Sequence, residues 1–474
     1  MTSFSGNRNY RWWVVYISAF ATFIVGIDSS IVIVCFPKLA ETFHVDASVI
    51  SWVNITYLVL SQSLMLMFGR LGDGSGRKRV YMAGLVCYAA GLLICSFSQN
   101  VAHLLIGRSI QGIATAASVS MGMAIAVAAF PEGERGKPLG LVTSARSLGL
   151  VIGPVLGGLI VDFLGWRAVF FTRFPITLLG LFFAWWVIDD QKAGGEFRLD
   201  VWGSGTLFFW LSSLMLFLSF GGKWGFRTGL VLALGALTAV LFCLFLQIER
   251  KCHHPIINLD LFRKPLFAAA SASATCQGAT TMTVIFLLPF YLIQGLGYSS
   301  SLAGSLLSII ALPPLLVAPI SGRLSDRMGS RPLSTLGMSM IFLAVYLLWR
   351  LDSHPGIFPI AAGLAVLGAG MGTFQPPNNS AILGSVPRSM LGTASAVVST
   401  ATQLGLSAGF AIAGTVFSAR ESFHSAALFH NGTGPSLLKS LSVVGSFHDT
   451  LLVAMVSCGL GVIACLVRGS DRSV

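Results

Sequence analysis

The residue with the clearest potential for chemistry is an acid inside an apolar stretch. Asp28 lies within residues 12–37, a run long enough to cross a membrane, and we place no other acidic residue as deep in such a run. A carboxylate in hydrocarbon is costly and usually serves a function. Burial favours its neutral form and a neighbouring cation favours its charged form, so Asp28 could bind and release a proton if the two effects balance. A static ion pair is the alternative.

Arginines in apolar stretches are the second group with chemical potential. Arg108, Arg146 and Arg173 lie in such stretches of the first half, and the second half offers amides in place of deep acids. Because an unpaired buried cation is costly, this excess of positive charge favours neutral, zwitterionic or anionic substrates over dicationic ones. Snorkelling of Arg146 and Arg173 to the membrane interfaces is the alternative. The candidate residues for a substrate cavity are Gln111, Arg146, Arg173, Gln277, Gln375 and Asn378.

These residues are positioned by membrane-spanning helices. Hydrophobic residues make up 54% of the 474 positions and charged residues 10%, and mean hydropathy is +0.80. About fourteen apolar stretches are each long enough to cross ~30 Å of hydrocarbon as a helix. The sequence therefore predicts an all-α polytopic membrane protein with spans at 12–37, 49–69, 80–97, 103–129, 139–162, 166–188, 201–220, 228–248, 266–293, 302–322, 333–350, 357–384, 391–418 and 446–467, with a long outer loop at 419–445.

The net charge of +12 does not require a nucleic-acid partner. Most Lys and Arg fall in loops on one side of the predicted membrane, which is the bias of cytoplasmic loops. This bias and the even number of spans predict that both termini are cytoplasmic. The adjacent His253 and His254 beside Cys252 have poor spacing for zinc, so no metal is expected.

One polar loop occurs twice. Residues 69–80 read GRLGDGSGRKRV and residues 322–333 read GRLSDRMGSRPL, an offset of 253. Each copy lies between the second and third span of a six-span unit. Such internal repeats are typical of transporters with a central substrate site. We therefore divide the chain into an N-terminal six-helix bundle (1–188), a linker with two extra spans (189–264) and a C-terminal six-helix bundle (265–474). A catalytic or sensory role for the linker is the alternative.

Four motifs resemble one family, the fourteen-helix drug:proton antiporter branch of the major facilitator superfamily. The loop from Gly69 resembles the superfamily loop signature, and Asp28 to Pro37 resembles the first-helix signature of the branch, with Ile33 where Asn is usual. Arg108 with Gln111 and Gly112 resembles the fourth-helix signature. Arg173 stands where the family usually has Asn. The fifth-helix antiporter signature is matched by Gly149, Gly153, Pro154, Gly157 and Gly158.

The resemblance implies roles for these residues. The first and fourth helices line the central cavity in this superfamily, so Asp28 and Arg108 are expected to meet and to couple transport to protons. Gly69, Asp73, Gly76 and Arg77 form the implied cytoplasmic gate loop, for which a positive-inside turn without a gating role is the alternative. The glycine face of the fifth helix is expected to pack closely on a neighbouring helix, and Pro154 is expected to bend it.

The implied function is export of small amphipathic compounds, of the multidrug type, in exchange for protons by alternating access. The alternative is a dedicated exporter of one endogenous metabolite, such as a siderophore or an organic anion. The expected partners are a small-molecule substrate, protons and the lipid bilayer, with the proton gradient in place of a cofactor. We expect a monomer in the plasma membrane, a bacterial inner membrane, and no enzymatic activity, since only Asp28 is deep enough for intramembrane acid–base chemistry.

Overall fold

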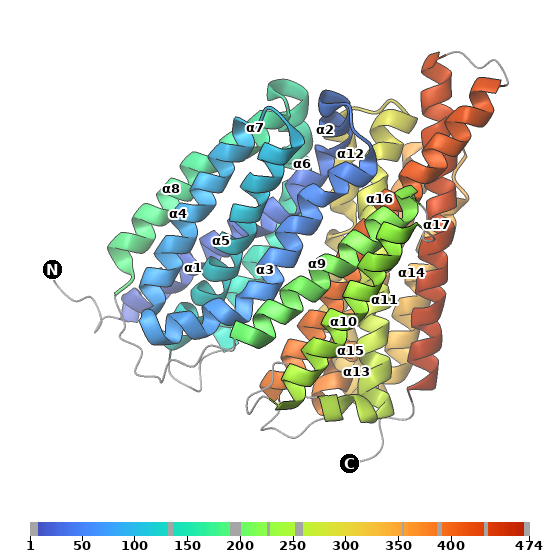
Figure 1. The fold of residues 1–474 in the computed structure, drawn as a ribbon. Coiled ribbons are helices and arrows are strands. Elements are labelled where there is room, and N and C mark those ends of the chain that lie inside the picture. The colour runs from blue at the N-terminus through green and yellow to red at the C-terminus, as the bar shows by residue number, and fades with distance from the viewer. Residues whose placement is uncertain are drawn as a thin grey trace. The chain divides into compact units, whose positions relative to one another are not determined.

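The computed structural model describes residues 8–130, 136–189, 201–224, 228–251, 259–352, 355–385, 391–430 and 435–468. Over these residues the regular structure is helical throughout (Figure 1). The chain divides into two compact units. The first comprises residues 1–44 and 52–208, and the second comprises residues 45–51 and 209–474.

The helices of the first half follow the apolar runs closely. They are α1 (Arg8–Val34), α2 (Phe36–Phe43), α3 (Ala47–Ser75), α4 (Arg77–Ser96), α5 (Val101–Ala128), α6 (Gly136–Leu164), α7 (Trp166–Phe171) and α8 (Arg173–Val187). The expected sixth span is therefore two helices, α7 and α8, which meet at Thr172. Pro175 has no N–H to donate to the preceding turn, which accounts for a break in the helix at this level.

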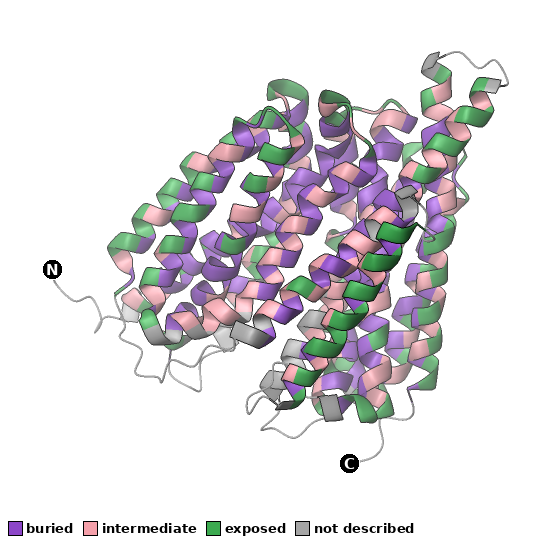
Figure 2. Cartoon of the chain, viewed as in Figure 1, coloured by how far each residue is buried: buried purple, intermediate pink, exposed green. Residues whose placement is uncertain are grey.

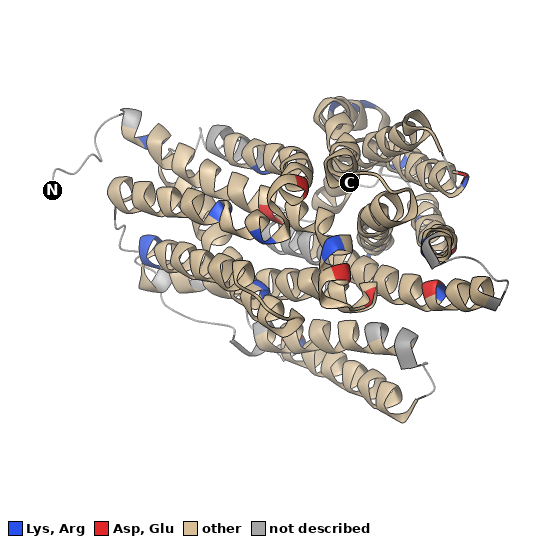
Figure 3. Cartoon of the chain, turned by 90° about the horizontal axis from the view of Figure 1, so that it is seen from above, with Lys and Arg blue, Asp and Glu red and all other residues tan. Residues whose placement is uncertain are grey.

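The helices of the second half are α9 (Val201–Trp224), α10 (Gly229–Lys251), η2 (Leu259–Arg263), α11 (Pro265–Pro289), η3 (Phe290–Gly295), α12 (Ser300–Ile309), α13 (Leu312–Met328), α14 (Ser330–Trp349), α15 (Ile357–Gly384), α16 (Leu391–His430) and α17 (Pro435–Val467). Among the described residues, 12 helical spans are long and apolar enough to cross a membrane. The predicted spans 201–220 and 391–418 are the two that are not in this set. Lys, Arg, Asp and Glu are sparse along the described helices (Figure 3).

The first unit packs α6 against α1 through glycines. A Cβ on Gly149 would meet the carbonyl oxygen of Phe23, and one on Gly153 would meet Ser30 Oγ. Gly157 lies in the same way against Ile31, with 2.7 Å from its hypothetical Cβ to the side chain. The glycine face predicted for the fifth span therefore lies on the helix that carries Asp28. The α-helix continues through Pro154.

The second unit repeats this contact between α16 and α11. A Cβ on Gly405 would meet the carbonyl oxygen of Thr275, and one on Gly409 would lie 2.5 Å from the carbonyl oxygen of Ala279. The first helix of each pair also has a glycine at the crossing. Gly26 in α1 lies against the backbone of Arg146, as Gly278 in α11 lies against that of Thr402.

The two extra helices, α9 and α10, pair through aromatic side chains. The ring of Trp210 lies 4.8 Å from that of Phe242 and stacks on that of Phe245 at 6.1 Å. α10 is otherwise exposed along much of its length (Figure 2), as expected for a helix that faces lipid. The boundary between the two units falls within α9, after Phe208, so the separate linker 189–264 remains a prediction.

The predicted long loop at 419–445 is wrong over most of its length. α16 continues to His430 and α17 begins at Pro435, and the two helices extend together beyond the predicted spans (Figure 1). Asp449 Oδ2 joins them, accepting from Arg420 Nε at 2.6 Å and lying 2.7 Å from His424 Nε2. Residues 419–430 and 435–445 are therefore helical.

Candidate functional site

The candidate site lies within the first unit and surrounds Asp28. Arg108 comes from α5 and Arg173 is the first residue of α8. Arg108 Nη1 lies 3.0 Å from Asp28 Oδ2, and Arg173 Nη1 forms an ion pair with Asp28 Oδ1. The structure thus brings together three helices at one carboxylate. Asp28 and Arg108 are 0% exposed and Arg173 is 3% exposed.

Arg108 is held on every side. Its Nε donates to the carbonyl oxygen of Val53 at 3.1 Å and its Nη2 to Asn54 Oδ1 at 3.0 Å. Nη1 also donates to Gln111 Oε1 at 2.8 Å. The guanidinium carbon lies 4.1 Å from the centre of the Tyr57 ring, a favourable arrangement for a buried cation. Each of its three nitrogens has a partner, which fixes the side chain in place.

Arg173 is held less completely. Its Nε donates to the carbonyl oxygen of Val169 at 2.8 Å, one turn earlier in the chain, and its guanidinium carbon lies 5.2 Å from the centre of the Phe170 ring. Nη1 contacts Asp28. Nη2 has no hydrogen-bond partner among the residues that the structure describes. Asp28 therefore has one fully coordinated cationic partner and one with a free donor.

The cluster carries a net positive charge. With Asp28 ionised, two guanidinium groups face one carboxylate, and these three are the buried charged residues among those described in the first unit. In water-free surroundings such charges interact strongly, and an uncompensated one is costly. With Asp28 ionised, the cluster therefore holds one positive charge more than its carboxylate compensates.

Three partners of Arg108 were not predicted from the sequence. They are Asn54, Tyr57 and the carbonyl oxygen of Val53, all on α3. Asn54 and Tyr57 are three residues apart and therefore share one helix face. A polar and an aromatic residue at this spacing within a predicted span indicate a shared helix face. The spacing does not indicate which neighbouring helix that face contacts.

The other predicted cavity residues lie elsewhere. Arg146 and Gln375 are exposed. Gln277 is buried and donates to Thr281 Oγ1 within α11, at 3.0 Å. Asn378 is buried in the second unit, where its Nδ2 donates to the carbonyl oxygen of Ala270 at 3.0 Å. Only Gln111 and Arg173 of the six predicted cavity residues join the cluster around Asp28.

Arg468, at the end of α17, is a further buried cation of the second unit. Its Nη1 lies 3.3 Å from both Asn378 Oδ1 and Ser334 Oγ, and its Nη2 donates to Ser330 Oγ. Its burial was not predicted from the sequence, because Arg468 lies just beyond the last predicted span. These partners come from α14 and α15, so Arg468 ties three helices of this unit together.

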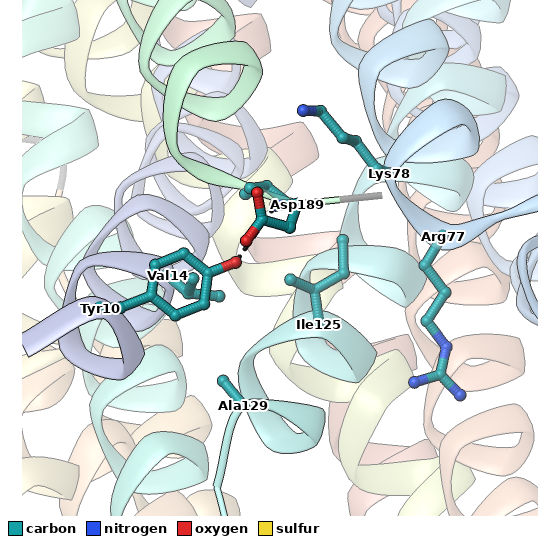
Figure 4. A pocket seen from close by; sticks show the side chains of 8 residues that line it. Tyr10, Val14, Arg77, Lys78, Ile125, Ala129 and Asp189 are labelled. Carbon is teal, nitrogen blue, oxygen red and sulfur yellow. Dashed lines mark hydrogen bonds between the residues drawn. The ribbon is translucent and has the colours of Figure 1, made fainter. Parts of the chain in front are cut away.

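The predicted gate loop is mostly helical: Gly69 and Asp73 lie in the last turns of α3, and Gly76 alone separates α3 from α4. Gly76 has φ of 104°, a conformation that suits glycine, and α4 begins at Arg77. The Asp73 side chain lies outside the described residues. Arg77 and Lys78 line a pocket with Tyr10 and Asp189 (Figure 4). Tyr10 and Asp28 lie 18 residues apart on α1, about 27 Å at helical rise, so this pocket is distinct from the Asp28 cluster.

The two loop copies share one contact. Lys78 Nζ donates to the carbonyl oxygen of Trp185 at 3.0 Å, in the last turn of α8. Arg331 Nη2 donates to the carbonyl oxygen of Leu466 at 2.5 Å, in the last turn of α17. Arg331 stands 253 residues after Lys78, the offset of the repeat itself. In each unit a cation from the repeated segment thus caps the C-terminal end of a helix, where a positive charge is favourable.

A metal-dependent site finds no support among the described residues, which contain no group of three or more His, Cys, Asp or Glu side chains suited to a metal ion. The segment Cys252 to His254 lies outside them.

Comparisons with known proteins agree with this architecture. The riboflavin transporter RibZ of Clostridioides difficile strain 630 is 28% identical over 471 residues, which cover 98% of this chain and 99% of that protein. The multidrug transporter protein MdtP of Bacillus subtilis strain 168 is 27% identical over 416 residues, 88% of this chain and 77% of that protein.

The fold also matches a solved structure. A bacterial homologue of the human lysosomal transporter Spinster, in an inward-facing and unoccupied conformation, aligns with a TM-score of 0.68 at 14% identity, over 99% of this chain and 100% of that one. Residues 18–248 and 270–438 match the Major Facilitator Superfamily. The chain, an integral membrane protein built of apolar helices, therefore belongs to the Major Facilitator Superfamily of transporters.

Proposed function

We propose that this protein exports small amphipathic compounds in exchange for protons, by alternating access, and that Asp28 carries the proton. The observation that supports this most is the buried contact of Asp28 with Arg108 and Arg173 in a member of a transporter family. Buried ionisable groups in membrane helices commonly serve as proton relays.

The cluster suggests how proton binding acts on the helices. When Asp28 is ionised, its carboxylate links α1 to α5 and to α8. Protonation removes the negative charge and weakens both links. α1 is also the helix on which the glycine face of α6 rests, through Gly149 and Gly153. A change in the contacts of Asp28 would therefore alter the packing of α1 against α5, α6 and α8.

The remaining features of the proposal follow the sequence. We propose fourteen membrane-spanning helices, with α9 and α16 crossing as well, cytoplasmic termini, a bacterial inner membrane and a functional monomer. The proton gradient supplies the energy without a cofactor, and the gate loop with Asp73 closes the cytoplasmic side. The excess of buried positive charge favours neutral, zwitterionic or anionic substrates over dicationic ones, and we propose transport without catalysis.

A dedicated transporter of one metabolite is the second candidate. It is favoured by the relative named a riboflavin transporter, which aligns over nearly its whole length. The multidrug proposal is favoured by the relative named a multidrug transporter.

Transport in everted membrane vesicles under an imposed pH gradient tests both candidates. The panel contains cationic, neutral and anionic dyes together with riboflavin. Uptake of several unrelated dyes, driven by an acid vesicle interior, supports the multidrug proposal. Uptake of riboflavin alone supports the dedicated transporter, and uptake that does not depend on the pH gradient contradicts proton coupling in either.

A further inference from the structure

The geometry points to a binding subsite for a monovalent anion at Arg173, occupied when Asp28 takes up its proton. This inference rests on the proposed role of Asp28. It identifies a second ligand of the same cluster, an anion of halide or carboxylate chemistry.

The first observation is the difference between the two arginines. All three guanidinium nitrogens of Arg108 have partners, on α1, α3 and α5. Arg173 uses Nε on the carbonyl oxygen of Val169 in α7 and Nη1 on Asp28, while Nη2 has no partner among the described residues although the side chain is almost completely buried. A buried hydrogen-bond donor without an acceptor is unfavourable. An acceptor from outside the chain that binds at Nη2 would remove this cost.

A second unpartnered donor belongs to the same cluster. Gln111 accepts from Arg108 through Oε1, but its Nε2 has no partner among the described residues and the residue is 0% exposed. Gln111 contacts Arg108 and Arg173 contacts Asp28, so both residues belong to the cluster around Asp28. The cluster therefore offers two spare N–H donors, which are the groups that an anion binds.

The third observation is the charge balance. Two guanidinium groups and one carboxylate leave one positive charge when Asp28 is ionised and two when it is protonated. The protonated cluster is the more costly one to bury without a counter-ion. An anion on Arg173 would neutralise part of that excess, and it would also take up the donor group that Asp28 releases.

The linkage has a definite direction. An anion close to Asp28 repels the ionised carboxylate, and it stabilises the additional positive charge that the cluster carries when Asp28 is protonated. Anion binding and proton binding at the cluster therefore favour each other. In a proton-driven exporter the anion would then accompany the proton on the return step. A free halide and the carboxylate of a transported compound share this chemistry, and experiment can separate them.

The test measures protons rather than transport. Purified full-length protein in weakly buffered detergent solution, with a soluble pH-indicator dye, receives potassium chloride or potassium acetate at several starting pH values. Because acetate itself binds protons, the change in protein-free solution is subtracted at each pH, and we then expect saturable proton uptake approaching one proton per protein with wild type. Uptake with chloride identifies a free halide as a ligand, and uptake with acetate alone identifies a carboxylate. The inference is overturned if neither anion causes uptake.

Variants assign the effect to the subsite. Arg173→Gln and Asp28→Asn should each reduce anion-dependent proton uptake at least fivefold, and Arg173→Lys, which keeps the charge but not the planar fork, should retain part of it. Arg167→Gln is the matched control, because Arg167 lies on the preceding short helix and its side chain is exposed. Wild-type uptake in the folded Arg173→Gln protein, checked by its thermal unfolding, overturns the assignment.

The outcomes separate this inference from the proposed function. If wild-type protein shows no anion-dependent proton uptake but its export depends on Asp28, proton-driven export stands and the anion subsite is ruled out. If wild-type protein shows anion-dependent proton uptake but its export does not depend on Asp28, the anion subsite stands and proton-driven export through Asp28 is ruled out.

Discussion

The two units share a scaffold but not its charges. In each, a glycine-lined helix lies on another helix, α6 on α1 and α16 on α11. In both, a cation of the repeated segment caps the C-terminal end of a helix, Lys78 on α8 and Arg331 on α17. The position that corresponds to Asp28, two residues after the crossing glycine, is Thr280 in α11, whose Oγ1 donates to the carbonyl oxygen of Cys276 at 2.9 Å.

This difference separates the contacts that hold each bundle together from the ion-pair cluster, which we propose couples transport to protons. Glycine contacts and helix caps need only small residues and cations at fixed positions, and both units keep them. The ion-pair cluster needs one acid and its arginines on three helices, and it occurs in the first unit. Substitutions at matched positions should therefore act alike where the scaffold is repeated and differ where it is not.

The largest difference is expected at the acid itself. Asp28→Asn removes the charge that both arginines contact, and we expect it to abolish uphill export driven by a pH gradient. The matched substitution Thr280→Asn changes a neutral side chain and should reduce export by less than twofold. Accumulation in everted vesicles measures both, with protein levels determined by immunoblot. Equal losses in the two variants would contradict the contrast.

Loss of Arg108 should be the largest effect on stability. Arg108→Gln leaves Asp28 with one partner and removes contacts to Val53 and Asn54, and breaking a buried ion pair costs about 3–5 kcal/mol. Thermal unfolding in detergent should therefore begin at markedly lower temperature. Arg146→Gln is the control, since that side chain is exposed and should unfold as wild type does. An Arg108→Gln protein as stable as the control would mean that the cluster does not hold the bundle.

The glycine contacts should respond alike in the two units. Gly149→Ala would push a methyl group into the backbone of Phe23, and Gly405→Ala would push one into that of Thr275. Overpacking of this kind costs roughly 1–3 kcal/mol. Comparable drops in thermal stability support a repeated scaffold. A drop confined to one variant would show that only one of the two helix pairs is tightly packed.

The helix caps should give the smallest effects. Lys78→Gln and Arg331→Gln each remove a cation from the last turn of a helix, which is worth about 0.3–1 kcal/mol. Both variants should show small, similar decreases in unfolding temperature that shrink at high salt. If either variant instead lost most of its stability, its loop would do more than cap a helix.

The sequence indicated much of the scaffold because long apolar runs and glycine spacing depend on local features alone. It also suggested the meeting of Asp28 and Arg108, through the motifs that contain them. Arg173 was left open between cavity and interface, since its direction depends on how α8 is rotated after the break at Thr172. Asn54 and Tyr57 were missed for a similar reason. The helical residues 419–430 and 435–445 were missed because a polar segment between two apolar runs is compatible with a loop and with helices that extend beyond the spans.

The most direct test of the central claim is proton movement caused by the exported compound. Everted vesicles with an acid interior, monitored with acridine orange, receive a compound that the protein transports. We predict that the compound partly dissipates the pH gradient with wild type and Thr280→Asn but not with Asp28→Asn. Wild-type dissipation by the Asp28→Asn protein would contradict the proposal that Asp28 carries the proton.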